Sequence, residues 1–329
     1  MEERAAIART LRASRRVLIV CHVGPDGDCL GAGLALAAAL DRLGVAATVA
    51  SPDGVPPSLR FLPGAGGVVA GVDDADAVEV AVTMECSSLD RCGPLEAAIR
   101  RAGVIAAIDH HADHTPYAHL TDWDPAAAAV GEQVADLIAR LGAPIDRPIA
   151  LGLLTALVTD TGAFRYANTT PRTLRLAADL VERGVTIHEI VRAVYEDRPP
   201  SALRLLGHAL AGLTLHHGGA VATTLITPAM LAAAGATAEE ASGVAGVLRT
   251  IAGVRVAMTF EDREGGVRVS IRTRDGARAD RVARALGGGG HRAAAGAEVS
   301  GALREVVRRA LDAAALEVTG GPDDAPEGC

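Results

Sequence analysis

The sequence predicts an α/β fold in which a doubly wound, mostly parallel sheet is followed by a smaller α/β domain. Up to about residue 195, short apolar runs typical of buried strands alternate with Ala- and Leu-rich stretches typical of helices. Pro199 and Pro200 then interrupt both kinds of element, and 329 residues suffice for about two domains. We therefore predict domains over residues 1–196 and 203–317, a linker over 197–202 and a disordered tail over 318–329.

Composition and charge indicate a globular, cytoplasmic enzyme. Apolar residues make up 49% of the chain, yet no apolar run approaches the roughly 18 residues of a membrane span. The N-terminal Met-Glu-Glu-Arg lacks the basic and apolar segments of a signal peptide. The five cysteines form no CxxC pair, which favours a reduced compartment. A net charge of −8 argues against a surface that attracts long nucleic acids.

The first predicted strand, residues 17–20, leads into a loop that is rich in candidate metal ligands. His22, Asp26 and Asp28 fall within seven residues of this loop, and a helix over about residues 30–43 follows it. The loop matches neither the dinucleotide-binding nor the phosphate-binding glycine motif, and its spacing is not that of a calcium loop. The ordinary alternative is a polar loop in which an aspartate caps the helix.

Two further predicted strands are also followed directly by candidate metal ligands. The strand predicted at 78–82 is followed by Glu85, and the strand at 104–108 runs directly into Asp109-His110-His111. Ligand sites of open α/β sheets lie beyond the carboxyl ends of the strands, so we expect these side chains to meet at one edge of the sheet. For Glu85 taken alone, a solvated strand end is an equally good interpretation.

Helices complete the first domain and supply one more acidic side chain. Asp124-Pro125 predicts the start of a helix that runs to about residue 141, because proline is favoured directly after an aspartate cap. A second apolar helix, at about 147–159, ends in Asp160, and Arg165 follows shortly after it. The stretch Asn168-Thr-Thr-Pro171 is expected to cap the next helix.

The second domain is predicted to contain hairpins, helices and a glycine-rich loop. One hairpin turns at Gly218-Gly219, and two more strands flank Gly265-Gly266. A helix at about 278–286 leads into four glycines and His291. Consecutive glycines let a backbone approach a ligand closely and direct several N–H groups at an anion. A flexible linker is the alternative interpretation of this run.

The candidate ligands of the first domain are carboxylates and imidazoles: His22, Asp26, Asp28, Glu85, Asp109, His110, His111 and Asp160. So many carboxylates cannot share one site without compensation, because like charges raise each other's pKa values. Two divalent cations would resolve the repulsion, and mixed carboxylate and imidazole ligands suit Mn²⁺, Zn²⁺, Fe²⁺ or Co²⁺ better than Ca²⁺. A two-metal cluster with arginines nearby predicts phosphoester hydrolysis.

Four ordered motifs resemble those of the DHH phosphoesterase family: residues 22–31, Asp109-His110-His111, residues 159–165 and residues 287–296. The last is similar to the DHH-associated C-terminal domain of that family. The resemblance covers about residues 15–315 and points to the members that are both oligoribonucleases and 3′-phosphoadenosine 5′-phosphate phosphatases. It implies two divalent ions, Mn²⁺ first and Mg²⁺ or Co²⁺ as alternatives, in a cleft between the DHH and the DHH-associated domain.

The resemblance also implies a role for each motif residue. One ion would be held by His22 and Asp26, the other by Asp28, His110 and Asp160, and Glu85 would bridge both. Asp109 would orient a ligand imidazole, His111 would face the scissile phosphate and Arg165 would stabilise its charge. The substrate would be bound by His114, Arg272, Gly288, Gly289, Gly290 and His291. Glu85 and His114 depart from the Asp and Asn that the family usually has at these positions.

The reaction that the resemblance implies is attack on phosphorus by a hydroxide held between two metals. The expected substrates are short RNA oligonucleotides, cut 3′ to 5′ to nucleoside monophosphates, and 3′-phosphoadenosine 5′-phosphate. The chain is acidic and poor in aromatic residues, so no groove for long single strands is expected. A cyclic-di-AMP or linear dinucleotide phosphodiesterase is the close alternative. A nucleotide-binding sensor with an impaired metal site is the alternative from another class, and a homodimer is left open.

Overall fold

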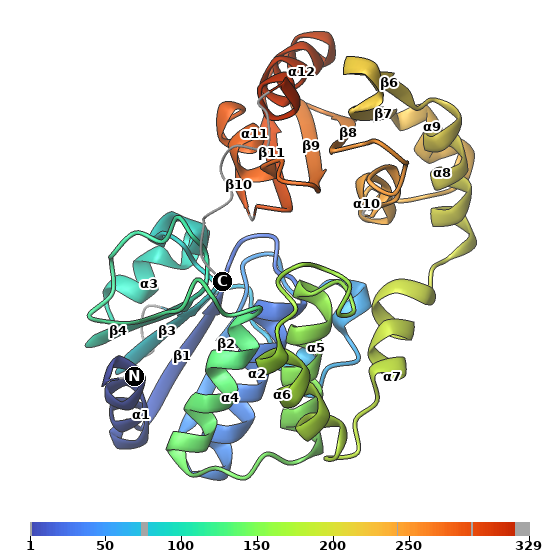
Figure 1. The fold of residues 1–329 in the computed structure, drawn as a ribbon. Helices are drawn as coiled ribbons and strands as arrows, with labels where there is room; N and C mark the ends of the chain where they lie inside the picture. The colour runs from blue at the N-terminus through green and yellow to red at the C-terminus, as the bar shows by residue number, and fades with distance from the viewer. Residues whose placement is uncertain (1, 74–77, 242, 291, 320–329) are drawn as a thin grey trace. The chain divides into compact units, whose positions relative to one another are not determined.

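The computed structural model describes residues 2–73, 78–241, 243–290 and 292–319 (Figure 1). The chain divides into two compact units, with the boundary in the sequence between Asp197 and Arg198. Each unit has its own sheet and its own hydrophobic core. Among the described residues, no helix is long and apolar enough to cross a membrane.

The first unit contains the predicted parallel sheet. Its strands lie in the order β2-β1-β3-β4-β5, and all neighbours are parallel. They are β1 (Arg16–Cys21), β2 (Ala46–Ala50), β3 (Val80–Met84), β4 (Val104–Asp109) and β5 (Leu120–Trp123). Sequence analysis did not predict β5, because it has only four residues, most of them partly exposed, and lacks an apolar run. The prediction of a doubly wound α/β fold is confirmed.

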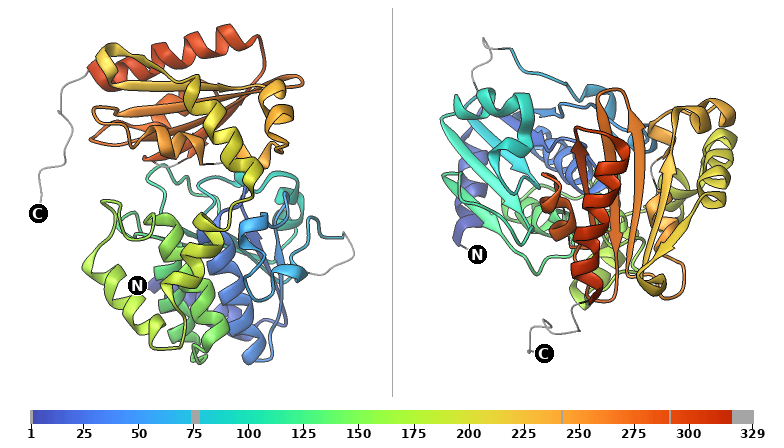
Figure 2. Two further views of the ribbon diagram at one scale, coloured as in Figure 1. Left: turned by 90° about the vertical axis from the view of Figure 1, so that its right-hand side faces the viewer. Right: turned by 90° about the horizontal axis from the view of Figure 1, so that it is seen from above.

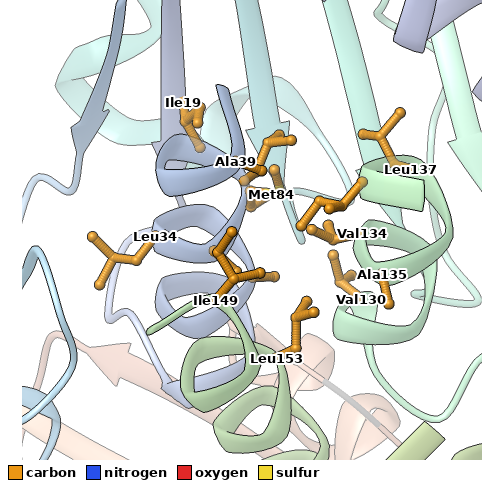
Figure 3. Packing of buried hydrophobic residues seen from close by; sticks show 14 of the residues in the cluster. Ile19, Leu34, Ala39, Met84, Val130, Val134, Ala135, Leu137, Ile149 and Leu153 are labelled. Carbon is orange, nitrogen blue, oxygen red and sulfur yellow. The ribbon is translucent and has the colours of Figure 1, made fainter. Parts of the chain in front are cut away.

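Helices cover both faces of this sheet. They are α1 (Glu2–Ala13), α2 (Gly27–Arg42), α3 (Glu96–Arg100), α4 (Val130–Leu141), α5 (Arg147–Asp160), α6 (Pro171–Val181) and α7 (Ile187–Val191). Alternate residues of β1 face opposite ways, so Val17 and Ile19 pack in the larger core and Leu18 and Val20 in a smaller one that includes residues of α3. Figure 3 shows side chains of α2, α4 and α5 gathered around Ile19 and Met84 of the sheet.

The predicted helix start at Asp124-Pro125 is wrong, because α4 begins at Val130 after an extended Ala129 (φ −159°, ψ 151°). A helix beginning at 125 would use the carbonyls of Ala127 and Ala128 for its own ladder. Here those carbonyls lie 3.0 Å from His110 Nδ1 and 3.0 Å from Asn168 Nδ2 instead. Tertiary hydrogen bonds to the site therefore delay the helix by about one turn.

The cap predicted for α6 also differs in detail. Thr170 is the N-cap, and its hydroxyl accepts a hydrogen bond from the Thr173 N–H within a reciprocal capping box. Asn168 lies two residues before the cap, and its side chain bonds elsewhere.

The second unit is built on a six-stranded sheet in the order β10-β11-β9-β8-β7-β6. Its strands are β6 (Thr214–His216), β7 (Val221–Ile226), β8 (Val256–Arg263), β9 (Gly266–Thr273), β10 (Gly289–Gly290) and β11 (Ala294–Val299). Both predicted hairpins are present, and only β7 and β8 run parallel. The glycine run is part of the sheet, since Gly289 and Gly290 pair with β11. His291 lies outside the described residues.

The helices of the second unit are α8 (Pro200–Ala211), α9 (Pro228–Ala234), α10 (Val244–Leu248), α11 (Ala279–Ala285) and α12 (Leu303–Thr319). The first begins within the predicted linker, and the last continues through Thr319. The views in Figure 2 show α12 lying along one face of this sheet, where Val306, Ala310 and Ala314 are buried.

Candidate metal centre

The carboxyl ends of β1, β3 and β4 bring the predicted ligands together with the end of α5. Three groups of donor atoms are found in the described part of the chain, in each of which all atoms lie within 4.8 Å of one another. The smallest comprises Glu85, His110 and His111, and the two larger groups are called the first and the second cluster. The first cluster contains His22, Asp26, Cys29 and Glu85, and the second contains Asp28, Glu85, His110 and Asp160. Glu85 belongs to both clusters.

The separations within the clusters fit ligands of a common ion. His22 Nε2 lies 3.8 Å from Asp26 Oδ2 and 3.7 Å from Glu85 Oε2. His110 Nε2 lies 3.8 Å from Asp28 Oδ2, 3.6 Å from Glu85 Oε1 and 3.8 Å from Asp160 Oδ2. These distances exceed those of hydrogen bonds. Two ligands about 2.1 Å from one cation lie about 3–4 Å apart, so each cluster suits a divalent ion.

Glu85 reaches both clusters from a strained backbone position. It follows β3 with φ 60°, a left-handed conformation that costs a non-glycine residue about 1–3 kcal/mol. Its N–H donates to the carbonyl of Ile108 on the neighbouring strand at 2.9 Å, which helps to hold this turn. Its carboxylate is fully buried, with Oε2 toward His22 and Oε1 toward His110.

The two aspartates of the first loop are held by backbone amides. Asp26 is the N-cap of α2, where Oδ1 accepts from the N–H groups of Asp28 and Cys29 while Oδ2 faces His22. Asp28 accepts from the N–H groups of Val130 and Gly131 at 2.7 and 3.0 Å. The cap and ligand interpretations of Asp26 are therefore compatible, because its two oxygens have different partners.

Burial and the neighbouring carboxylates together determine the pKa values in the second cluster. Burial and the Glu85 charge raise the pKa of Asp28 well above its usual value. Burial alone would lower the pKa of His110, but Glu85, Asp160 and Asp28 outweigh it and hold that pKa well above the usual value. Protons thus take up the excess negative charge when metal is absent, and a divalent cation would replace them.

Asp109 organises the imidazoles beside the second cluster. Its Oδ1 lies 2.7 Å from His111 Nδ1 and its Oδ2 lies 2.6 Å from His114 Nδ1. Burial tends to raise the pKa of Asp109, but the hydrogen bonds from His111 and His114 hold it below the usual value. The imidazole of His110 is instead oriented by the Ala127 carbonyl. Asp109 therefore positions His111 and the buried side chain of His114, and the Ala127 carbonyl supports His110, a candidate metal ligand.

The remaining predicted residues lie outside the two clusters. Arg165 donates from Nε to the Gly162 carbonyl at 2.6 Å, in a turn where residues 162–164 all have φ near 60°. Arg272 lies on β9 in the second unit and donates to the Ile271 carbonyl at 2.9 Å. Gly288 precedes β10, and a side chain there would overlap β11, since a Cβ would lie 2.1 Å from the Gly296 carbonyl oxygen.

Sequence analysis missed three side chains around the site. Cys29 Sγ belongs to the first cluster, and its place inside the ligand loop was the available signal. Gln133 and Asn168 hydrogen-bond to backbone carbonyls of site residues, and nothing in their local sequence indicates this.

Comparison with known proteins identifies the family. The chain matches two family models, "DHH family, N-terminal domain" over residues 16–158 and "DHHA1 domain" over residues 220–319. It is 38% identical to the bifunctional oligoribonuclease and PAP phosphatase NrnA of Thermus thermophilus, over 97% of this chain and 95% of that protein. The protein of that name from Bacillus subtilis is 28% identical, over 89% of this chain and 92% of that protein.

A solved structure shows the same fold over nearly the whole chain. It is an exopolyphosphatase-related protein from Bacteroides fragilis, with a TM-score of 0.87, 24% identity and coverage of 95% of both chains. The clusters of candidate metal ligands, the two family matches and the relative of 38% identity agree with one another. The chain therefore belongs to the DHH family of metal-dependent phosphoesterases.

Proposed function

We propose that this chain hydrolyses very short RNA oligonucleotides, 3′ to 5′, to nucleoside monophosphates, and 3′-phosphoadenosine 5′-phosphate to AMP. The observation that carries the proposal is the pair of donor clusters that share Glu85. Both activities are named for the two relatives, which match this chain over nearly their whole length. The free thiols of Cys21, Cys29, Cys86 and Cys92 support a cytoplasmic location.

Two divalent ions are proposed, one for each cluster. His22, Asp26 and Glu85 would hold the first, and Asp28, Glu85, His110 and Asp160 the second. Their carboxylate and imidazole donors favour Mn²⁺, with Mg²⁺ and Co²⁺ as alternatives. Such ions supply a hydroxide at neutral pH and offset charge on the phosphoryl oxygens.

The residues of the chain would orient the substrate and move a proton. The Nδ1–H of His111 points at Asp109 Oδ1, so Nε2 is the atom that can give a proton to the leaving oxygen. The buried carboxylate of Asp109 stabilises the imidazolium that this step requires and fixes the tautomer. Arg165 would stabilise phosphoryl charge. Arg272, the glycine run and His291 would bind the nucleotide.

A panel of substrates and metals tests this proposal. Metal-stripped protein is supplied with Mn²⁺, Mg²⁺ or Co²⁺ and given a diadenylate, 3′-phosphoadenosine 5′-phosphate or cyclic-di-AMP. Released AMP is measured, together with the linear diadenylate that forms from the cyclic dinucleotide. We expect AMP from the first two, a loss of at least about 100-fold in Asp28→Ala, and no loss in Asp312→Ala, which removes an exposed carboxylate of α12. Faster cleavage of the cyclic dinucleotide would favour the phosphodiesterase alternative. Binding of nucleotides without hydrolysis under every metal would identify a sensor.

A further inference from the structure

Asn168 and Gln133 are the only asparagine and the only glutamine in the 329-residue sequence, which also contains no lysine. Both side chains donate to main-chain carbonyls of site residues in the first unit. Both carboxamide side chains of the sequence therefore lie beside candidate metal ligands.

Asn168 connects the segments that carry the second cluster. Its Nδ2 donates to the carbonyl of Ala128 at 3.0 Å and to the carbonyl of Asp160 at 3.2 Å. Asp160 is a donor of the second cluster and the last residue of α5. Asn168 therefore ties the end of α5 to the segment Ala127–Gly131.

The segment Ala127–Gly131 in turn holds two more members of that cluster, His110 and Asp28. The Ala127 carbonyl bonds to His110 Nδ1 at 3.0 Å. The N–H groups of Val130 and Gly131 bond to the two oxygens of Asp28. Through this segment, one carboxamide is connected to Asp28, His110 and Asp160, and these hydrogen bonds involve neither His22 nor Asp26.

Gln133 of α4 makes the corresponding connection to the ends of β4 and β5. Its Nε2 donates to the carbonyl of Asp122 at 2.8 Å and to the carbonyl of Asp109 at 3.3 Å. These carbonyls belong to the ends of β5 and β4, and Asp109 directly precedes His110. The side chain of Gln133 is fully buried. It fixes the strand end from which His110 and His111 extend.

A carboxamide suits this task because one uncharged, planar nitrogen carries two N–H donors. All four partners are carbonyls, which accept and cannot donate, so the nitrogen must face them. Among the described residues, Asn168 Oδ1 and Gln133 Oε1 are buried without a hydrogen-bond partner. A buried acceptor without a partner is unfavourable. The two donor bonds are therefore the interactions that these side chains contribute.

We propose that Asn168 and Gln133 are positioning residues that set the metal affinity of the second cluster and leave the first cluster unaffected. This inference rests on the proposed two-metal centre. Outer-shell partners of metal ligands commonly contribute 10–100-fold to affinity. Asn168→Asp and Gln133→Glu preserve shape but turn an oxygen toward two carbonyls, so they should disturb positioning more than packing.

The test is a Mn²⁺ titration of the metal-free full chain. Binding is measured by calorimetry and by the electron paramagnetic resonance signal of the free Mn²⁺. The wild type should bind two ions. Asn168→Asp and Gln133→Glu should bind one with unchanged affinity and the other about 10–100-fold more weakly. Excess Mn²⁺ should then restore kcat, which it would not do for a misfolded site. If Asn168→Asp does not fold, Asn168→Ala, which removes both donors without adding charge, replaces it.

The matched control is Thr224→Val in the second unit, which removes a buried hydrogen bond to the Ala209 carbonyl and should leave both Mn²⁺ affinities unchanged. Wild-type affinities in the Asn168 and Gln133 variants would overturn the inference and leave the proposed function intact. Equal weakening of both ions would reduce the two residues to a general structural role and also overturn it. A wild type that binds no Mn²⁺ would overturn the proposed function as well.

Discussion

The substitution Gly152→Ala should separate two helices that carry ligands of the second cluster. Gly152 of α5 faces Gly31 of α2, and a Cβ at 152 would lie 2.6 Å from the Gly31 carbonyl oxygen. A carbon–oxygen contact needs roughly 3.3 Å, so the helices must move apart by about 0.7 Å. Asp28 is on α2 and Asp160 ends α5, so the movement acts on both ligands.

The size of the effect follows from the contact. Overpacking of a core costs about 1–3 kcal/mol, and the upper end applies because the contacted atom is main chain. Alanine returns up to about 1 kcal/mol of helix propensity. The net loss should therefore be about 2 kcal/mol. Metal sites tolerate about 0.5 Å of displacement, so the affinity of the second cluster for Mn²⁺ should fall as well.

Urea unfolding of the metal-free protein measures the stability change in the first unit. Trp123 on β5 is the only tryptophan and reports on that unit. The control is Gly207→Ala in α8, where a Cβ meets nothing within 4 Å. This substitution should stabilise its own helix by about 0.5–1 kcal/mol. Circular dichroism during unfolding measures that change. A Gly152→Ala protein within about 0.5 kcal/mol of the wild type would refute the reasoning.

Three further predictions concern the site. His114→Leu removes one charge-assisted hydrogen bond to Asp109 and should lower kcat about 10–100-fold. His114→Asn can still donate to Asp109, so its kcat should fall less. Steady-state kinetics measure both variants, and equal decreases in kcat would contradict the prediction. Because the pKa values of His110 and Asp28 are raised, bound metal should displace protons from them, and the affinity for Mn²⁺ should rise with pH. Calorimetric titrations with Mn²⁺ in buffers of different ionisation enthalpy count the released protons. A count of zero would contradict the prediction. Removing the metal with a chelator should lower the Tm of the first unit by about 5–10 °C, compared with protein in Mn²⁺ at 100 times its Kd. Calorimetry measures this difference. An unchanged Tm would contradict preferential binding of Mn²⁺ to the folded state.

The sequence was sufficient to predict four of the five strands of the first sheet and the edge at which the candidate ligands gather. The apolar runs before His22, Glu85 and Asp109 are strands with parallel neighbours, so the rule for carboxyl ends of strands placed the chemistry correctly. These strands could be predicted because a short apolar run that stops at a charged residue has few interpretations other than a buried strand.

Local patterns failed where tertiary contacts compete with them. Asp124-Pro125 is a good helix start, yet the Ala127 and Ala128 carbonyls are taken by His110 and Asn168. The roles of Gln133 and Asn168 depend on carbonyls 8 to 40 residues away, to which no sequence spacing points. The left-handed backbone of Glu85 was equally hidden, because glutamate has no preference for it.

The most direct test of the central claim is the electron paramagnetic resonance of the protein loaded with Mn²⁺. If Glu85 bridges two clusters as its two oxygens indicate, the wild type should hold two Mn²⁺ per chain and give the spectrum of an exchange-coupled pair. Glu85→Gln should weaken that coupling. One Mn²⁺ per chain, or two that give only the six-line signal of isolated ions, would contradict the shared centre.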